Sequence, residues 1–263
     1  MSPRRRLLLL LVGGVLVVAL VAAVLVSVSG REPEAGGPVA QDRPGPVLLV
    51  PGYGGSRAGL LALAGRLKAS GRQADVLTLE GDGTGDLNRQ VAVLDRAVDG
   101  ALAAGAPSVD VVGYSAGGVV TGLWAARDDG ASKARRIVTL GAPLHGTKVA
   151  ALGSAFAPDA CPDACRQLAP GSSLLGELDR ARTAPAVPWL SVWTTGDETV
   201  TPPDTARLDG ATNVELQQLC PGAAVSHSAL PTDSAVTGLV QRALSTAPLS
   251  SAPADCGTLR AAA

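Results

Sequence analysis

The stretch VDVVGYSAGG, residues 109–118, decides how the rest of the chain is interpreted. An apolar run ends in the pentapeptide GYSAG (113–117), and the helical sequence GGVVTGLWAAR follows at once. A strand, a tight turn and a helix in this order form the context in which G-x-S-x-G presents a nucleophilic serine. Glycines keep side chains out of the turn, and amides at the start of the helix favour negative charge. We therefore predict that Ser115 is a nucleophile rather than an ordinary turn residue.

A serine hydroxyl is a poor nucleophile until a neighbouring base removes its proton. The chain contains two histidines, His145 in LGAPLHGT and His227 in AVSHSAL. Where this kind of turn belongs to a triad, the order along the chain is serine, acid, histidine. His227 satisfies that order, and His145 comes too early. We predict His227 as the base and His145 as a hydrogen-bonded loop residue near the site.

The acid is expected at the carboxyl end of a late strand. Asp197 comes two residues after the apolar run Trp189–Thr195. A carboxylate there can reach the imidazole, hold its tautomer and stabilise the imidazolium without taking the proton. We predict Asp197 as the acid, with Glu198 and Asp204 as alternatives. Without Ser115 and His227 in order, Asp197 would be interpreted as a turn residue.

Attack by a serine creates an oxyanion, which needs hydrogen-bond donors already in place. We predict the amide of Ala116 as one donor and the amide of Tyr53, in the loop VPGYGGS (50–56), as the other. This loop lacks the lysine of a phosphate-binding loop and the last glycine of a dinucleotide fingerprint. The acidic sequence EGDGTGD (80–86) does not have the spacing of a helix–loop–helix calcium site, so we expect a loop that borders the active site.

Short apolar runs alternate with helical patterns after residue 46, which predicts an α/β fold. The sheet is expected to be mostly parallel, with about six strands and helices on both faces, because most of the runs are continuously apolar rather than alternating. The predicted strands are Val47–Val50, Asp75–Leu79, Val109–Tyr114, Arg136–Leu140, Trp189–Thr195 and Asn213–Gln217. The clearest helices are expected from Asp86 to Gly105 and from Asp233 to Leu244.

The interval from Leu144 to Pro188 interrupts this alternation because it contains no convincing strand. Insertions after strand ends gather around the ligand site of an open α/β sheet. We therefore expect this interval to form a partial cover over the site, held together by its own cysteines.

Composition excludes one broad class of function. The 263-residue chain has 22 basic and 23 acidic residues, a net charge of −1, and no basic patch beyond Arg4–Arg6. Nucleic-acid binding needs a concentrated basic surface, so we expect no nucleic-acid partner. Aromatic residues make up 2% of the chain, which predicts an aliphatic core.

The N-terminus predicts export. Three arginines precede an uncharged run, and the segment from Leu7 to Val26 is 20 residues, enough to cross a bilayer at about 1.5 Å per residue. Residues 1–30 are therefore a signal peptide or a membrane anchor, and both place the catalytic domain outside the cell membrane. We expect a Pro/Gly-rich linker at 31–46, a folded domain at 47–247 and a C-terminal tail at 248–263.

Four cysteines agree with that compartment, since an even number in an exported chain favours disulfides. Cys161, Cys165, Cys220 and Cys256 allow three pairings. We favour Cys161–Cys165 and Cys220–Cys256, because the first two are close in sequence and the second bond would hold the tail. A zinc site is the weaker alternative, because the second pair is irregularly spaced and no histidine cluster lies nearby.

The chain resembles secreted bacterial lipases and esterases of the α/β-hydrolase superfamily, particularly the small class 2 triacylglycerol lipases. The motifs behind this resemblance are VPGYGGS, VDVVGYSAGG, RIVTLGAPLHGT, WLSVWTTGDETV and VSHSAL. The resemblance implies Ser115, Asp197 and His227 as the catalytic triad, with oxyanion amides at Tyr53 and Ala116. It also implies hydrolysis of lipid or other carboxylic esters through an acyl-enzyme, without a metal or organic cofactor.

Two departures from that family alter the wall of the pocket. Such lipases usually have His-Gly where this chain has Pro51-Gly52, and often histidine where it has Tyr114. Two other functions are consistent with the same residues. An acyltransferase would use the same triad with an alcohol as acceptor, and a membrane-tethered binding protein would keep the hydrolase scaffold without catalysis.

Overall fold

The computed structural model describes residues 3, 14, 39–127, 129–181, 187–249 and 255–263. The chain divides into two compact units, Met1–Pro38 and Val39–Ala263. The predicted signal peptide or anchor lies outside the described residues except at positions 3 and 14, and so does the linker up to residue 38. Within the described part of the chain, no helix has the length and apolar character needed to span a bilayer. The division into leader, linker, domain and tail stays a prediction.

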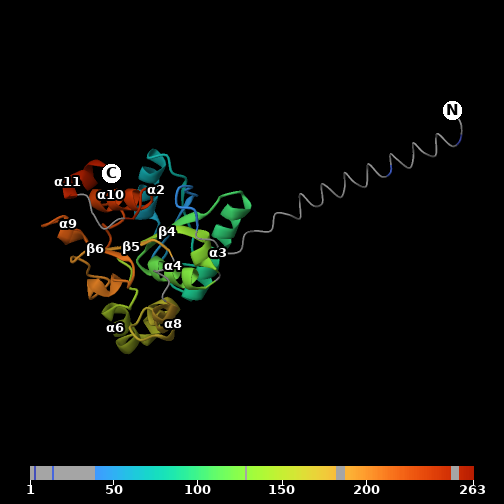
Figure 1. The fold of residues 1–263 in the computed structure, drawn as a ribbon. Coiled ribbons are helices and arrows are strands. Elements are labelled where there is room, and N and C mark those ends of the chain that lie inside the picture. Colours follow the sequence, from blue (N-terminus) through green and yellow to red (C-terminus); the bar gives the residue numbers. More distant parts are fainter. Residues whose placement is uncertain (1–2, 4–13, 15–38, 128, 182–186, 250–254) are drawn as a thin grey trace. The chain divides into compact units, whose positions relative to one another are not determined.

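The second unit is built on a six-stranded sheet with the order β2-β1-β3-β4-β5-β6 (Figure 1). Every neighbouring pair of strands is parallel, which confirms the predicted fold class. The strands are β1 (Val47–Val50), β2 (Ala74–Val76), β3 (Val109–Tyr114), β4 (Ala134–Leu140), β5 (Trp189–Trp193) and β6 (Thr212–Glu215).

The sequence-based strand ends were wrong by a few residues at several positions. β2 ends at Val76 instead of Leu79, because this edge strand pairs only with β1. β6 ends at Glu215, and Gln217 lies in the short helix α9, from which its side chain donates to Thr194 Oγ1 at 2.8 Å.

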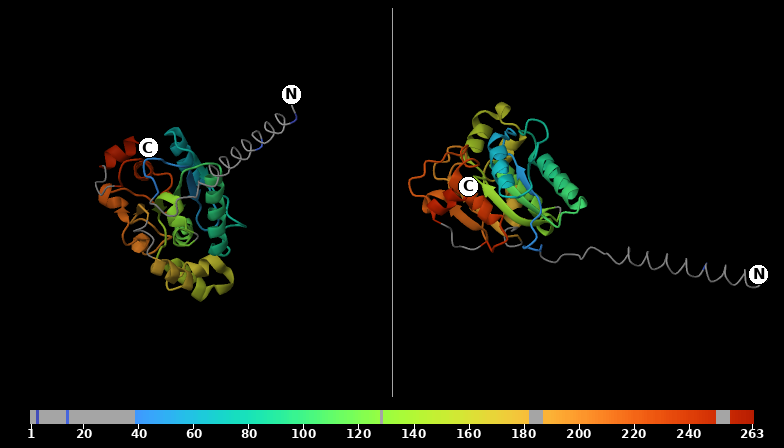
Figure 2. Two further views of the ribbon diagram at one scale, coloured as in Figure 1. Left: turned by 45° about the vertical axis from the view of Figure 1, so that its right-hand side comes forward. Right: turned by 90° about the horizontal axis from the view of Figure 1, so that it is seen from above.

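Helices cover both faces of the sheet, as the two views in Figure 2 show. The α-helices are α2 (Ala58–Ala69), α3 (Leu87–Ala103), α4 (Ala116–Ala126), α5 (Gly130–Lys133), α6 (Lys148–Phe156), α7 (Asp163–Gln167), α8 (Ser173–Ala181), α9 (Leu216–Leu219), α10 (Ser234–Ala243) and α11 (Cys256–Ala261). One hydrophobic cluster, mostly aliphatic but including Trp124 and Trp189, joins β1 and β3 to α3, α4 and α8, and a second joins the other face to α2 and α10. Along β1, Leu48 belongs to the first cluster and Leu49 to the second, because successive strand residues point to opposite faces.

The amino-terminal edge of the sheet contains a buried ion cluster that the sequence analysis did not predict. Asp110 in β3 and Arg135 in β4 are fully buried. Asp110 Oδ2 accepts hydrogen bonds from Arg135 Nη2 and Arg72 Nη2, each at 2.6 Å. Arg135 and Arg136 also donate to backbone carbonyls between residues 243 and 247, at the end of α10. Cations are favourable there because the carbonyl end of a helix is partly negative.

The described part of the segment between β4 and β5 contains no strand, as expected, and its helices were not predicted. It contains α6, α7 and α8, and a disulfide joins Cys161, which follows the short 3-10 helix η1 (Pro158–Ala160), to Cys165 in α7. A second disulfide joins Cys220, after α9, to Cys256 at the start of α11. Both bonds have the pairing that the sequence analysis favoured.

Candidate active site

Ser115 lies in the sharp turn between β3 and α4. Its backbone angles are φ 53° and ψ −129°, a strained combination for a residue with a side chain. The flanking glycines are required by space. A Cβ at Gly117 would lie 2.3 Å from the carbonyl oxygen of Val50, and one at Gly113 would lie 2.6 Å from the Cα of Gly118. The turn therefore holds the serine at the carboxyl edge of the sheet.

Three side chains distant in sequence meet at this edge. His227 Nε2 lies 2.9 Å from Ser115 Oγ, and His227 Nδ1 lies 2.6 Å from Asp197 Oδ2. The exposed fraction is 8% for Ser115, 6% for His227 and 5% for Asp197, so little water reaches these hydrogen bonds. Because the carboxylate only accepts hydrogen bonds, Nδ1 is the protonated nitrogen, and Nε2 is free to accept from the serine hydroxyl.

The carboxylate is held from its other side. Asp197 Oδ1 accepts hydrogen bonds from the amides of Thr199 at 2.9 Å and Val200 at 2.7 Å. Hydrogen bonds from backbone amides stabilise the charged form of a carboxylate and fix its orientation. Oδ2 is therefore directed at the imidazole.

The loop VPGYGGS passes beside the serine. A Cβ at Gly52 would lie 2.8 Å from Ser115 Cβ and 3.3 Å from Ser115 Oγ, so only glycine permits this approach. Tyr53 is the next residue, and Ala116 is the first residue of α4. The first amides of a helix have no partner within the helix, so the Ala116 amide is available to an anion. The oxyanion roles of Tyr53 and Ala116 remain predictions.

The alternative acids and the second histidine lie apart from this arrangement. Glu198 and Asp204 are exposed. His145 Nδ1 lies 2.9 Å from Asp179 Oδ1, and its Nε2 lies 3.0 Å from the carbonyl oxygen of Arg207. Both of its ring nitrogens therefore face hydrogen-bond acceptors. These contacts connect the loop of His145 to α8 through Asp179 and to the backbone at Arg207.

The acidic sequence EGDGTGD borders the site, as expected. The amide of Gly54 donates to the carbonyl of Gly83 at 3.3 Å, so this loop supports the one that includes Tyr53. On its other side, the amide of Ala164 in α7 donates to the carbonyl of Thr84 at 3.1 Å. The loop thus connects the site to the disulfide-bonded segment.

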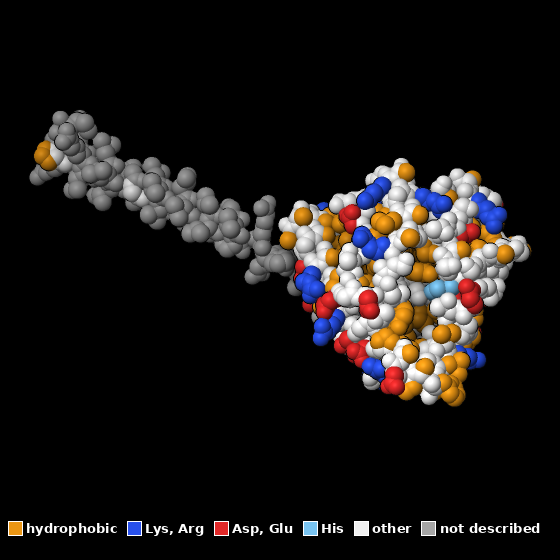
Figure 3. All heavy atoms as spheres, turned by 180° about the vertical axis from the view of Figure 1, so that it is seen from behind, with side chains coloured by type: hydrophobic (Ala, Val, Ile, Leu, Met, Phe, Trp, Pro, Cys, Tyr) orange, Lys and Arg blue, Asp and Glu red, His pale blue; other side chains and the backbone are white. Residues whose placement is uncertain are grey.

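An apolar stripe is exposed on α6. Val149, Leu152 and Phe156 lie on one face of this helix, and Phe156, the chain's only phenylalanine, is 82% exposed. Figure 3 shows apolar side chains gathered at the lower end of the domain, where α6 lies. The helix is attached to the loop after Asp197, since Thr147 Oγ1 donates to the carbonyl of Thr199 at 2.9 Å.

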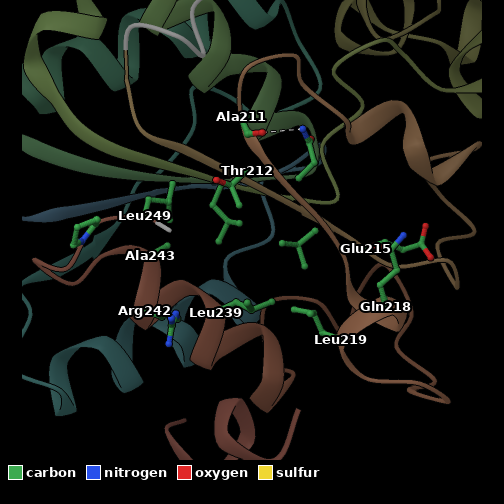
Figure 4. Close-up of a pocket in the computed structure, with 13 residues that line it drawn as sticks. Ala211, Thr212, Glu215, Gln218, Leu219, Leu239, Arg242, Ala243 and Leu249 are labelled. Carbon is green, nitrogen blue, oxygen red and sulfur yellow. Dashed lines mark hydrogen bonds between the residues drawn. The ribbon is translucent and has the colours of Figure 1, made fainter. Parts of the chain in front are cut away.

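A separate cavity of about 380 Å³ lies between β6 and α10 (Figure 4). Its lining residues are Leu190, Ala211, Thr212, Asn213, Val214, Glu215, Gln218, Leu219, Leu239, Arg242, Ala243, Pro248 and Leu249. No residue of the predicted triad lines it, so it is not part of the candidate active site.

No protein-family model and no curated protein matches this sequence. Solved structures do match. Lipase B of Aspergillus fumigatus has a TM-score of 0.67 and 21% identity, over 88% of this chain and 58% of that one. The mature Bacillus licheniformis lipase BlEst2 has a TM-score of 0.55 and 19% identity, over 71% and 86%. The chain has the α/β-hydrolase fold. This hydrolase fold is the one that the sequence resemblance implied.

A further solved structure shows that the fold is shared more widely. The N-formylmaleamic acid deformylase of Pseudomonas putida has a TM-score of 0.50 and 17% identity, over 76% of this chain and 92% of that one. Neighbours with this hydrolase fold therefore include enzymes named for different activities. At such identities the likeness establishes the fold, and the chemistry of this chain has to be argued from its own residues.

Two features of the site were not predicted from the sequence. Tyr114 Oη donates to the carbonyl oxygen of His227 at 3.2 Å, and Thr147 ties α6 to the loop after Asp197. The position of Tyr114 next to Ser115 in the motif was the only available signal. No local pattern pairs a residue with another 113 positions away.

Proposed function

We propose that this protein is a serine hydrolase that cleaves carboxylic esters through an acyl-enzyme on Ser115. The observation that supports this most strongly is the continuous set of contacts from Asp197 Oδ2 through both nitrogens of His227 to Ser115 Oγ, at 2.6 and 2.9 Å. A nucleophile, a base and an orienting acid within hydrogen-bond distance are the parts that acyl transfer needs.

In the acylation step, Ser115 Oγ attacks the ester carbonyl carbon while His227 Nε2 accepts the hydroxyl proton. Asp197 stabilises the imidazolium and keeps its proton on Nδ1. The carbonyl oxygen becomes an oxyanion, which the amides of Tyr53 and Ala116 stabilise by hydrogen bonding. Collapse of the intermediate breaks the bond to the alcohol, whose oxygen takes the proton from Nε2.

In the deacylation step, water takes the place of the departed alcohol. His227 Nε2 removes a proton from the water as its oxygen attacks the acyl carbon. Collapse of the second intermediate breaks the bond to Ser115 Oγ, which recovers its proton from the imidazolium. The acid product leaves and the starting arrangement is restored.

The proposed substrates are acyl esters of lipids or small alcohols. Two structural neighbours are named as lipases, and the sequence motifs resemble those of class 2 triacylglycerol lipases. The exposed apolar stripe of α6, attached to the loop after Asp197, would suit an aliphatic acyl chain or a lipid surface. Because the chain spans 58% of the length of the Aspergillus lipase, that enzyme's substrate range does not transfer to it directly.

The same proposal includes an extracellular location. Two disulfides are consistent with an oxidising compartment outside the cytoplasm. Residues 1–30 are proposed to be either a signal peptide that is removed or an anchor that is retained. Only the retained anchor would attach the protein to the membrane.

The direct test is turnover of p-nitrophenyl esters of increasing acyl length, together with labelling by a fluorophosphonate probe. We expect turnover of the wild-type protein, covalent labelling at Ser115 and neither result for Ser115→Ala. A wild-type protein that neither hydrolyses the esters nor reacts with the probe would show that the scaffold is not a serine hydrolase and would favour the binding-protein alternative.

A further inference from the structure

The base of the proposed triad is on a loop without regular secondary structure. Residues 220–233 connect α9 to α10, and the disulfide from Cys220 to Cys256 holds the start of this loop. Thr194 Oγ1 donates to the carbonyl of Val225 at 2.7 Å, and Gln217 Nε2 donates to the carbonyl of Ala223 at 3.0 Å. The buried side chains of Val225 and Leu230 also hold the loop, so what remains to be explained is how the ring of His227 is oriented within it.

Tyr114 contacts the proposed base directly, in addition to Asp197 and Ser115. Its hydroxyl donates to the carbonyl oxygen of His227 itself at 3.2 Å. Its ring also packs against the imidazole, with ring centroids 5.1 Å apart and planes tilted by 31°. One side chain thus contacts both the backbone and the ring of His227.

The position of Tyr114 in the chain links the contact with His227 to the nucleophile. It is the last residue of β3 and directly precedes Ser115. The backbone that holds the nucleophile and the side chain that holds the base therefore belong to neighbouring residues. Any movement of the loop relative to the turn would have to break the hydrogen bond between Tyr114 and His227.

The hydroxyl is a permanent donor under ordinary conditions. Burial, followed by the nearby negative charges of Asp197 and Glu198, raises the pKa of Tyr114 to about 12. The phenol stays protonated well above neutral pH, so its hydrogen bond to a carbonyl is kept throughout the range in which a histidine base works.

We propose that Tyr114 is a positioning residue, which holds the loop and ring of His227 so that Nε2 stays within hydrogen-bond distance of Ser115 Oγ. This inference rests on the proposed function, because it gives Tyr114 a purpose in activating the serine. The hydroxyl acts on the backbone of the base rather than on a reacting atom. Small errors in the placement of a catalytic group lower the reaction rate strongly, so loss of a single hydrogen bond that positions His227 should reduce turnover.

The test is the variant Tyr114→Phe, which keeps the ring and removes only the hydroxyl. We expect kcat to fall about 3- to 10-fold, the worth of one hydrogen bond, while KM stays unchanged. Labelling of Ser115 by the fluorophosphonate should slow by a similar factor. The matched control is Thr232→Val, because Thr232 Oγ1 donates to the carbonyl of Ala229 in the same loop at 3.1 Å, and this variant should behave as wild type.

Unchanged kcat in a folded Tyr114→Phe variant would overturn the proposal. So would a raised KM at constant kcat, because that result would make Tyr114 a substrate contact. An equal loss of rate in Thr232→Val would also overturn it, since the effect would then be a general loosening of the loop.

A spectroscopic measurement separates this proposal from the proposed function. The proton shared by His227 Nδ1 and Asp197 Oδ2 should give a low-field NMR resonance, which a His145→Asn variant assigns because the chain has two histidines. We expect Tyr114→Phe to shift this resonance and to speed its exchange with water. A resonance that does not change would overturn the positioning role. Absence of both turnover and labelling in the wild-type protein would overturn only the proposed function.

Discussion

Two buried aspartates at opposite edges of the sheet invite comparison. Asp110 lies at the amino end of β3 and pairs with Arg72 and Arg135, whereas Asp197 lies beyond the carboxyl end of β5 and pairs with His227. Both carboxylates are almost inaccessible to solvent, and the contact distance is 2.6 Å in every case. Burial and a short contact are therefore shared by both edges and do not by themselves define a reactive site.

The partners make the difference. A guanidinium stays protonated in proteins, so the cluster around Asp110 has no proton to exchange and serves only to hold strands and the end of α10 together. An imidazole changes its charge near neutral pH, and its second nitrogen faces a hydroxyl. The amino edge is therefore expected to determine stability and the carboxyl edge to determine activity.

The largest effect should separate the two histidines. We expect His227→Ala to reduce ester turnover by about 10³-fold or more, because Ser115 loses its base. The matched variant His145→Ala should retain activity within a few-fold, since His145 contacts Asp179 and a backbone carbonyl instead. Steady-state kinetics on a short p-nitrophenyl ester measure both. Equal losses would remove the basis for placing the reactive edge at His227.

Exchanging each aspartate for asparagine tests the comparison itself. Asp197→Asn should lower kcat by about 10³- to 10⁴-fold, because an amide no longer holds the productive tautomer, with little change in the free energy of unfolding. Asp110→Asn should lower the free energy of unfolding by about 3 kcal/mol or more, because two partly or fully buried guanidinium groups lose their counter-charge. Urea denaturation and active-site titration distinguish the two outcomes. A catalytic defect in folded Asp110→Asn would contradict the division between edges.

A smaller effect should separate chemistry from substrate recruitment on the carboxyl side. Phe156→Ser removes the most exposed apolar side chain of α6. We expect turnover of emulsified long-chain esters to fall about tenfold, the worth of burying one large apolar side chain, while a soluble short ester is unaffected. Leu61→Ser, on α2, is the control for loss of an exposed apolar residue elsewhere. Identical profiles for both variants would argue against a role of α6 in lipid contact.

The smallest effect concerns strain at the nucleophile. Ser115 has a φ of 53°, which a residue without a side chain tolerates better. We expect Ser115→Gly to be inactive and yet to raise the free energy of unfolding by about 1 kcal/mol relative to Ser115→Ala. Thermal or urea denaturation of the two variants measures the difference. Equal stability would mean that the turn stores no strain at this position.

Much of the fold and of the site follows from local sequence. GYSAG between an apolar run and a helical run predicts the turn. A strand that turns sharply into a helix around a serine has no room for side chains on the flanking residues, so both are glycine. His227 was selected by its order after the acid, and the continuous apolar runs predicted a parallel sheet covered on both faces. These inferences depend only on which residues are neighbours in the sequence and on their order along the chain, so no tertiary structure is needed to make them.

Other features depend on which distant residues meet. Asp197 was one of three candidate acids, and only the folded loop brings its carboxylate, rather than that of Glu198 or Asp204, within 2.6 Å of the imidazole. Arginine is a residue type that is mostly exposed, yet Arg135 and Arg136 are buried in β4, because Asp110 and the carbonyls at the end of α10 compensate for their desolvation. The hydrogen bond from Tyr114 to His227 is equally invisible in a linear pattern.

The sequence by itself thus determined the class of fold, the turn at Ser115 and the choice of His227 over His145 as the candidate base, because each of these rests on spacing and order along the chain. The tertiary structure alone decided which carboxylate reaches His227, where the buried arginines find their counter-charge and how Tyr114 contacts the base. The physical reason is that hydrogen bonds and ion pairs act over about 3 Å in space, at any separation along the chain.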